Sequence, residues 1–275
     1  MSEWEHIVAM NRRSLSIAAI ALLAVVCLGM VAAVAFPLST GEPQAATESF
    51  DQHVDEEYQL SAAIETDGDV RLAVDGGVSE SGEGYVRIVD TGVTDTRYHD
   101  GDNDTVYRQL LIDDAGPDQP DADRYLEDIE DDPDERLVRE NRAGETTELV
   151  TVVENPDTEV GDRLDGGASV VTETLGVAEY DPVETSDGTQ TLSPTDSWFD
   201  EYRSYRITGS SGEVRIDAET NAVEHADVRW ELTTDVGSYA EYLLAGETTT
   251  QRITYEYEDG DVDVETPGWV DEIDD

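Results

Sequence analysis

The chain contains no lysine, so all 16 of its basic residues are arginines. No lysine amine is therefore present to form a Schiff base or to reach nucleotide phosphates in a P-loop. Against these arginines stand 66 Asp and Glu residues, which leaves a formal net charge of −50. Such a surface repels the phosphates of DNA and RNA, so nucleic acid is excluded as a partner.

The acidic residues are spread through nearly every stretch after Glu42. A binding site for a polycation would concentrate its charge, so the even spread reflects the environment of the protein instead. In dilute buffer this charge would destabilise a compact state. At about 1 M salt the Debye length falls to about 3 Å, and the repulsion nearly vanishes. We therefore expect the protein to come from an extreme halophile, specifically a haloarchaeon.

Cysteine is nearly absent too, because Cys27 is the only one. The rest of the chain can hold no disulfide, no cysteine-bound metal and no cysteine nucleophile. The Gly-x-Ser-x-Gly pattern of serine hydrolases is missing, and Ser210-Ser211 is expected in a hairpin turn. Residues 100–104 begin like a calcium loop, but Thr105 and Leu111 stand where the loop needs Gly and Glu. The sequence predicts a protein that is not an enzyme and has no catalytic residue, metal or cofactor.

One long uncharged run lies near the N-terminus, from Ser14 to Leu38. As a helix, residues 15–36 would span about 33 Å, enough for the hydrocarbon core of about 30 Å. Arg12 and Arg13 precede the run and acidic residues follow it, which places the N-terminus in the cytoplasm. The chain is thus expected to be a single-pass protein of the cell membrane. Its parts are a cytoplasmic segment at 1–13, a transmembrane signal anchor at 14–37, a linker at 38–47 and an exported acidic domain at 48–275.

Other interpretations of this run stay open. A signal peptide could be cleaved after the small-x-small sequence at residues 33–35, although its apolar core is longer than the usual ~7–15 residues. Cys27 could carry a lipid, but Val26 stands where lipidation favours a small residue. Arg12 and Arg13 could begin a twin-arginine export signal instead of setting topology alone. On the predicted outer side, Asn103 begins the one permitted glycosylation sequon and is a candidate for modification.

After the linker, apolar residues alternate with polar ones, as in strands with one buried face. Clear runs occupy residues 70–74, 86–88, 150–152, 213–218, 226–233 and 252–264. Turn sequences at 66–69, 220–221 and 258–261 predict hairpins between such runs. Helices are expected at 48–60, 122–129 and 238–244, and loops at 116–135 and 186–196. The expected fold is mainly β, of the α+β class, with an antiparallel sheet whose apolar face is covered by a few helices or by its own curling.

The C-terminal third places short strand-like segments at residues 205–209, 212–217, 223–233 and 254–257, followed by Val262-Asp263-Val264 and a Pro-x-Trp at 267–269. This succession resembles a group of haloarchaeal membrane-anchored or lipid-anchored proteins, whose exported domain is similar to the lipoprotein-carrier (LolA-like) fold. Residues 97–101, followed by Tyr107-Arg108, resemble a second signature of that group. The resemblance implies a curved antiparallel half-barrel with helices over its concave face, and it implies no catalytic residue.

Aromatic side chains gather in the same third of the chain. The alternation places five large side chains on one face of neighbouring strands, namely Val228, Trp230, Ile253, Tyr255 and Tyr257. We expect this face to bind a lipid or another hydrophobic moiety, because an apolar gap beneath a sheet takes up greasy molecules. The alternative is an ordinary core, in a structural or protein-interaction module of the cell envelope without a small ligand.

The charge generates a direct prediction. The residues from Ser14 onward hold 64 acids and 14 arginines, so this part alone carries the net −50. Circular dichroism in multimolar KCl should show a β-type spectrum that is lost on dilution to low salt, because screening of the self-repulsion is then lost. A spectrum that stays fully folded at low salt would show that core packing outweighs the repulsion.

Overall fold

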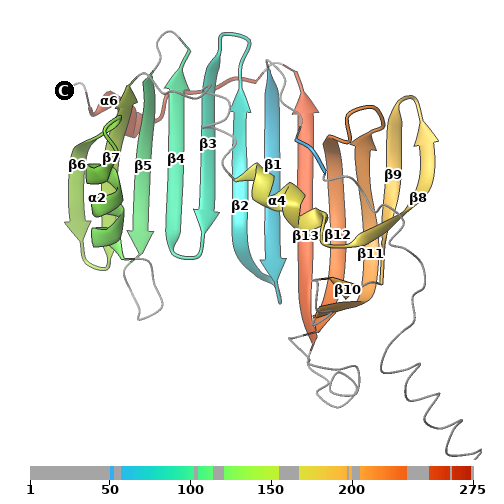
Figure 1. Ribbon diagram of the computed structural model, residues 1–275. Helices are drawn as coiled ribbons and strands as arrows, with labels where there is room; N and C mark the ends of the chain where they lie inside the picture. The colour runs from blue at the N-terminus through green and yellow to red at the C-terminus, as the bar shows by residue number, and fades with distance from the viewer. Residues whose placement is uncertain are drawn as a thin grey trace, which may run out of the picture.

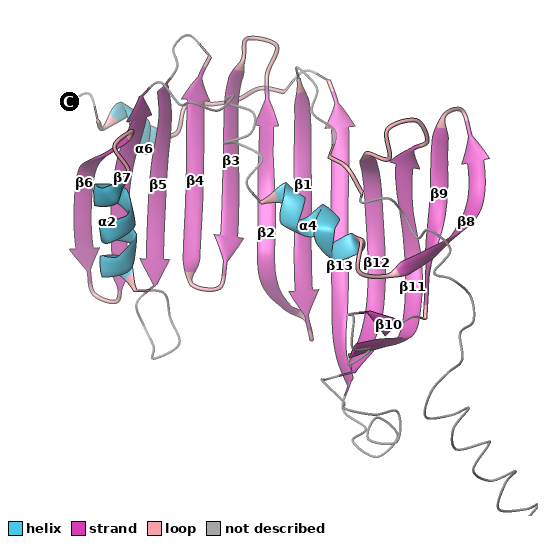
Figure 2. Ribbon diagram, in the orientation of Figure 1, coloured by secondary structure: helices cyan, strands magenta, loops and turns pink. Residues whose placement is uncertain are grey.

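The computed structural model describes residues 50–52, 57–101, 105–113, 121–154, 167–196, 198–199, 205–233, 248–260 and 262–273. Within them, one open antiparallel sheet dominates and helices are few (Figures 1 and 2). Twelve strands follow one path, in the order β6-β7-β5-β4-β3-β2-β1-β13-β12-β11-β9-β8, and the two-residue β10 pairs with β11 off this path. The prediction of a mainly β, antiparallel fold is confirmed.

The first seven strands are β1 (Tyr58–Thr66), β2 (Asp69–Val78), β3 (Glu83–Asp90), β4 (Val93–Asp100), β5 (Thr105–Asp113), β6 (Glu135–Ala143) and β7 (Thr146–Glu154). The remaining strands are β8 (Glu179–Ser186), β9 (Thr189–Thr195), β10 (Trp198–Phe199), β11 (Tyr205–Asp217), β12 (Val223–Thr233) and β13 (Thr248–Asp259). The helices are α2 (Ala122–Asp131), α4 (Ala168–Leu175) and α6 (Gly268–Asp271).

The chain enters the sheet in the middle, because β1 pairs with β2 on one side and with the last strand, β13, on the other. Strands β2 to β5 lead to one edge, which β7 and β6 complete, whereas β8 lies at the opposite edge. The connection from β7 to β8 therefore runs from one side of the sheet to the other. Helix α4 belongs to this connection and crosses β2, β1 and β13 (Figure 1).

Both longer helices cover the same face of the sheet. Ile88, Asp95, Leu110 and Leu149 lie side by side on consecutive strands, and directly opposed residues of antiparallel strands share a face. Ile88 packs in the large core cluster beneath α4, whereas Leu110 and Leu149 pack in a smaller cluster with α2. We call this surface the helix face of the sheet.

The other face carries the C-terminal segment after β13. Tyr85, Tyr98 and Tyr107 lie in register on β3, β4 and β5, and Val264 and Trp269 pack in the same cluster. The hydroxyls of Tyr98 and Thr266 share a hydrogen bond of 3.0 Å. In Figure 1 the segment passes behind the strands to reach α6. The expected hairpin at 258–261 is therefore wrong, because residues 262–273 form no strand and Val262 joins the tyrosine cluster instead.

Three other local predictions are also wrong. Residues 58–60 of the expected helix at 48–60 begin β1, because Tyr58, Leu60 and Ala62 continue the period-two burial of a strand. The expected loop at 186–196 contains β9, which buries Leu192 although the segment is otherwise polar. Ser210-Ser211 lies inside the long β11 and not in a hairpin turn.

Several predictions agree with the structure. The six alternating runs fall in β2, β3, β7, β11, β12 and β13, although residues 262–264 lie beyond the end of β13. The turns at 66–69 and 220–221 join β1 to β2 and β11 to β12, with positive φ at Asp67, Gly68 and Asn221. The helix expected at 122–129 is α2, so the loop expected at 116–135 is wrong over Ala122–Asp131. Its N-cap, Asp121, accepts the Asp123 amide.

The predicted transmembrane segment, with Arg12, Arg13 and Cys27, lies outside the described residues, as does the helix expected at 238–244. Within the part of the chain that the structure describes, no helix is both long enough and apolar enough to cross a membrane.

Candidate functional site

Helix α4 is amphipathic, and it turns its apolar side to the sheet. Its buried residues are Ala168, Val171, Thr172 and Leu175, which have the i, i+3, i+4, i+7 spacing of one helix face. Each buried Val or Leu side chain contributes roughly 1.5–3 kcal/mol. With only eight residues and many β-branched side chains, the segment is a weak helix former by itself. Its helical state therefore depends on packing against the strands beneath it.

Both ends of α4 are fixed to their surroundings. At the C-terminal end, the Tyr180 hydroxyl donates to the Leu175 carbonyl at 2.8 Å, and burial raises the pKa of Tyr180. The Tyr180 ring makes an edge-on contact with Phe50. At the N-terminal end, Gly167 lies so close to β2 that an added Cβ would come within 2.7 Å of Val74 Cγ2. Only glycine allows the chain to approach the sheet this closely here.

Beside this N-terminal end the helix face is not filled. A cavity of about 320 Å³ opens between α4 and strands β1, β2 and β3. The residues that line it are mostly apolar, with two charged residues among them: Ile64, Arg71, Leu72, Ile88, Asp90, Gly167 and Val170. Val170 lines this cavity and leaves 46% of its surface exposed. We call this space the α4 pocket.

The five residues predicted to bind a hydrophobic ligand all lie on the helix face. Val228 pairs directly with Ile253, and Tyr255 and Tyr257 follow along β13. Val228, Trp230, Ile253 and Tyr255 are at most 1% exposed and belong to the packed core, whereas Tyr257 is half-buried. None of the five lines the α4 pocket, although Ile253 pairs with the pocket residue Ile64. Their role in ligand binding stays a prediction.

A buried ionic network lies on the helix face between the two hydrophobic clusters. Arg97 and Arg108 are directly opposed on β4 and β5, an arrangement that is unfavourable for like charges. Asp95, only 8% exposed, accepts from both, with N–O distances of 2.9 Å to Arg97 and 3.0 Å to Arg108. Arg108 also contacts Glu135 at 3.2 Å, and Glu135 accepts a hydrogen bond from Thr151. Two carboxylates thus neutralise two guanidinium groups.

The network also shifts the titration of its central acid. Burial alone would raise the pKa of Asp95, but the charges and hydrogen bonds of Arg108 and Arg97 together lower it below 3.8. A small cavity of about 170 Å³ adjoins the two arginines and Glu135. Because both guanidinium groups already face carboxylates, this arrangement offers no unpaired positive charge to an anion.

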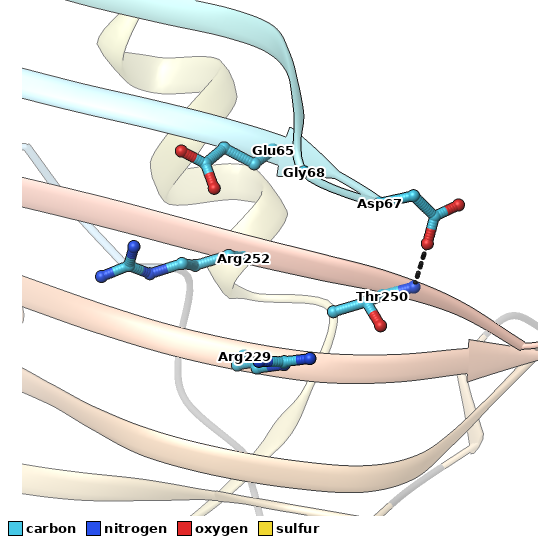
Figure 3. A pocket seen from close by; sticks show the side chains of 6 residues that line it. All are labelled: Glu65, Asp67, Gly68, Arg229, Thr250 and Arg252. Carbon is cyan, nitrogen blue, oxygen red and sulfur yellow. Dashed lines mark hydrogen bonds between the residues drawn. The ribbon is translucent and has the colours of Figure 1, made fainter.

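A second surface cavity, of about 460 Å³, lies on the face opposite α4 (Figure 3). Arg229 and Arg252 line it from β12 and β13, with Glu65 and Asp67 from β1 and the turn that follows. Asp67 accepts the Thr250 amide at 2.8 Å, as Figure 3 shows, and Arg252 holds Asp227 through two bonds of 3.0 Å. The cavity is wide and polar, and its lining holds two arginines and two acids, so it has no net charge.

The remaining predicted residues, Asn103, Arg12 and Arg13, lie outside the described residues. His99 is buried near Gly82 and Gly101, whereas His225 contacts Glu256 on the exposed face. Among the described residues, no group of three or more His, Cys, Asp or Glu side chains is placed to hold a metal ion.

No protein-family model matches this chain, and no curated protein matches it in sequence. The resemblance to the carrier-like haloarchaeal group therefore stays a prediction. Within its second signature, Arg97 and Tyr98 of β4 pair with Arg108 and Tyr107 of β5. They contribute the opposed arginines of the ionic network and the paired tyrosines of the other face.

The ionic network predicts an acid-sensitive contribution to stability. Because the pKa of Asp95 is lowered in the folded state, this contribution is present above about pH 4 and is lost as the pH falls through the lower folded value. Asp95→Asn should lower the free energy of unfolding at neutral pH by about 3 kcal/mol, since it leaves two opposed arginines without their shared acid. It should also remove this part of the pH dependence. Urea unfolding in multimolar KCl at several pH values measures both the free energy of unfolding and its dependence on pH.

Asp227→Asn is the matched control. This carboxylate also pairs with an arginine, but its side chain is 51% exposed. The substitution should therefore cost less than about 1 kcal/mol. Equal losses for the two variants would contradict the distinction between the buried and the exposed pair.

Proposed function

We propose that this protein is a membrane-anchored cell-surface domain of a halophile that binds the apolar part of a lipid or another hydrophobic molecule, without catalysis. The observation that carries the proposal is the α4 pocket. Its volume lies at the lower end of the range of small-molecule sites, about 300–1,000 Å³. Its walls are apolar side chains of β1, β2, β3 and α4, and the exposed Val170 would gain a partner on binding.

The sequence supplies the rest of this proposal. The uncharged run at 14–37 follows Arg12 and Arg13 and would anchor the domain on the outer side of the membrane. Membrane lipids would then be close to the domain. The resemblance to carrier-like proteins fits a sheet that is covered by helices on one face. The finer part of that expectation, a curved half-barrel with a concave binding face, belongs to the proposal. The packed residues around Trp230 would then form the floor next to the site.

A second candidate is a structural or protein-interaction module of the cell envelope with no small ligand. The observation that favours it is the burial of Val228, Trp230, Ile253 and Tyr255, which are at most 1% exposed and belong to the large core cluster. On this account the α4 pocket is a surface hollow, and the partner would be another envelope protein.

The two candidate functions predict different results with an apolar probe, because only the first one expects the probe to bind in the α4 pocket. The full-length chain, in phosphatidylcholine nanodiscs and multimolar KCl, is irradiated with dodecanol that carries a diazirine at the chain end. We expect label on α4 and on the strands around the pocket, located by fragmentation of the labelled peptides. Val170→Asp should reduce this label about tenfold, because the ligand would then desolvate a carboxylate.

Val183→Asp is the control. It adds the same charge, but Val183 is 66% exposed and lies on the edge strand β8, away from the α4 pocket. It should leave the label unchanged. Circular dichroism checks that both variants fold. We expect that they do, because substitutions at exposed positions usually change stability little. Absence of label at α4 in the wild-type chain would leave the structural candidate.

A further inference from the structure

Arg71 occupies an irregular position at the edge of the α4 pocket. Ile64 of β1 pairs with Leu72, but the next residue, Glu65, pairs with Val70, so Arg71 is the extra residue of a β-bulge. In a regular strand Arg71 and Leu72 would point to opposite faces of the sheet. Bulges redirect side chains, and here both residues line the same pocket on the helix face.

The Arg71 guanidinium has no ion pair or hydrogen bond with any residue in the described part of the chain. The other charged residue that lines the pocket, Asp90, accepts the backbone amide of Thr91 at 2.6 Å and does not pair with Arg71. Arg87 and Arg229 also have no ion pair within the described residues, but Arg71 differs from them because it lines a mostly apolar cavity.

Together, an apolar pocket and an unpaired guanidinium at its edge specify the chemistry of a ligand. We infer that the α4 pocket binds an amphiphile with one apolar chain and an anionic headgroup, a carboxylate or a phosphate monoester, and that Arg71 holds the headgroup. This inference rests on the proposed function and names the ligand class of the same site. The planar guanidinium can donate two parallel hydrogen bonds to either headgroup. Such direct contacts persist in concentrated salt, where charges further apart are screened.

The test uses dodecanoate and dodecanol, each with the same diazirine at the chain end, on the full-length chain in nanodiscs and multimolar KCl. At equal subsaturating concentrations, dodecanoate should label the pocket about tenfold more than dodecanol. Arg71→Gln should remove this preference and leave the dodecanol label within about twofold, because only the headgroup contact is lost. Dodecyl phosphate should compete with dodecanoate, whereas acetate and inorganic phosphate at the same concentration should not.

Arg87→Gln is the matched control, since Arg87 is an exposed arginine on β3 that lies opposite Thr96 and Asp75, on the face away from α4. It should leave both labels unchanged. Equal labelling by the two probes, with no effect of Arg71→Gln, would overturn the headgroup assignment while the proposed function stands. No labelling by either probe would overturn both. Displacement by acetate or phosphate alone would show a simple anion site and would also overturn the inference.

Discussion

The burial of one face of a very wide sheet is the constraint on which the other features depend. Twelve strands follow one another, and the two larger clusters of buried apolar residues lie on the face that carries α2 and α4. The strand order makes this cover possible, because the chain must travel from β7 to β8 at the opposite edge. Helix α4 lies on that route, over the central strands where the first and last strands meet. A helix of eight residues covers only part of so wide a surface, and the α4 pocket lies at its N-terminal end.

Charge is the second constraint, and it acts differently inside and outside. At the exposed surface the acids outnumber the arginines, and paired charges such as Asp227 and Arg252 add little to stability. On the helix face, Asp95 lies between Arg97 and Arg108 where the two hydrophobic clusters end. A carboxylate shared by two opposed arginines fixes the register of β4 and β5, since a shifted pairing would leave buried charges unpaired.

The strands could be predicted from the sequence because period-two alternation is a local property, as in Val228, Trp230 and their neighbours. The turn at Asp67-Gly68 could be predicted for the same reason, since positive φ favours these residue types. Helix α4 could not, because Val170, Val171 and two threonines favour a strand locally, and only contact with the sheet makes them helical. The sequence predicts a helix at 48–60, whereas Tyr58 and Leu60 are alternate buried residues of β1.

The candidate site was beyond sequence reasoning for a different reason. The α4 pocket joins Ile64, Leu72 and Ile88 with Gly167, which lies about 80 residues further along the chain. Neither the pairing of these strands nor the path of α4 across them can be predicted from a local sequence pattern. Arg71 was missed because alternation assigns it to the opposite face, and a bulge shows itself only in the register of two strands. The predicted ligand residues around Trp230 lie on the correct face but within its packed part.

The central claim is that α4 covers the middle of the sheet and holds it together. Amide hydrogen exchange of the full-length chain in multimolar KCl tests this most directly, because protection reports local opening. The account predicts the slowest exchange in β1, β12 and β13, beneath or beside α4, and fast exchange in the exposed edge strand β8. Exchange in β1 and β13 that is as fast as in β8 would contradict it.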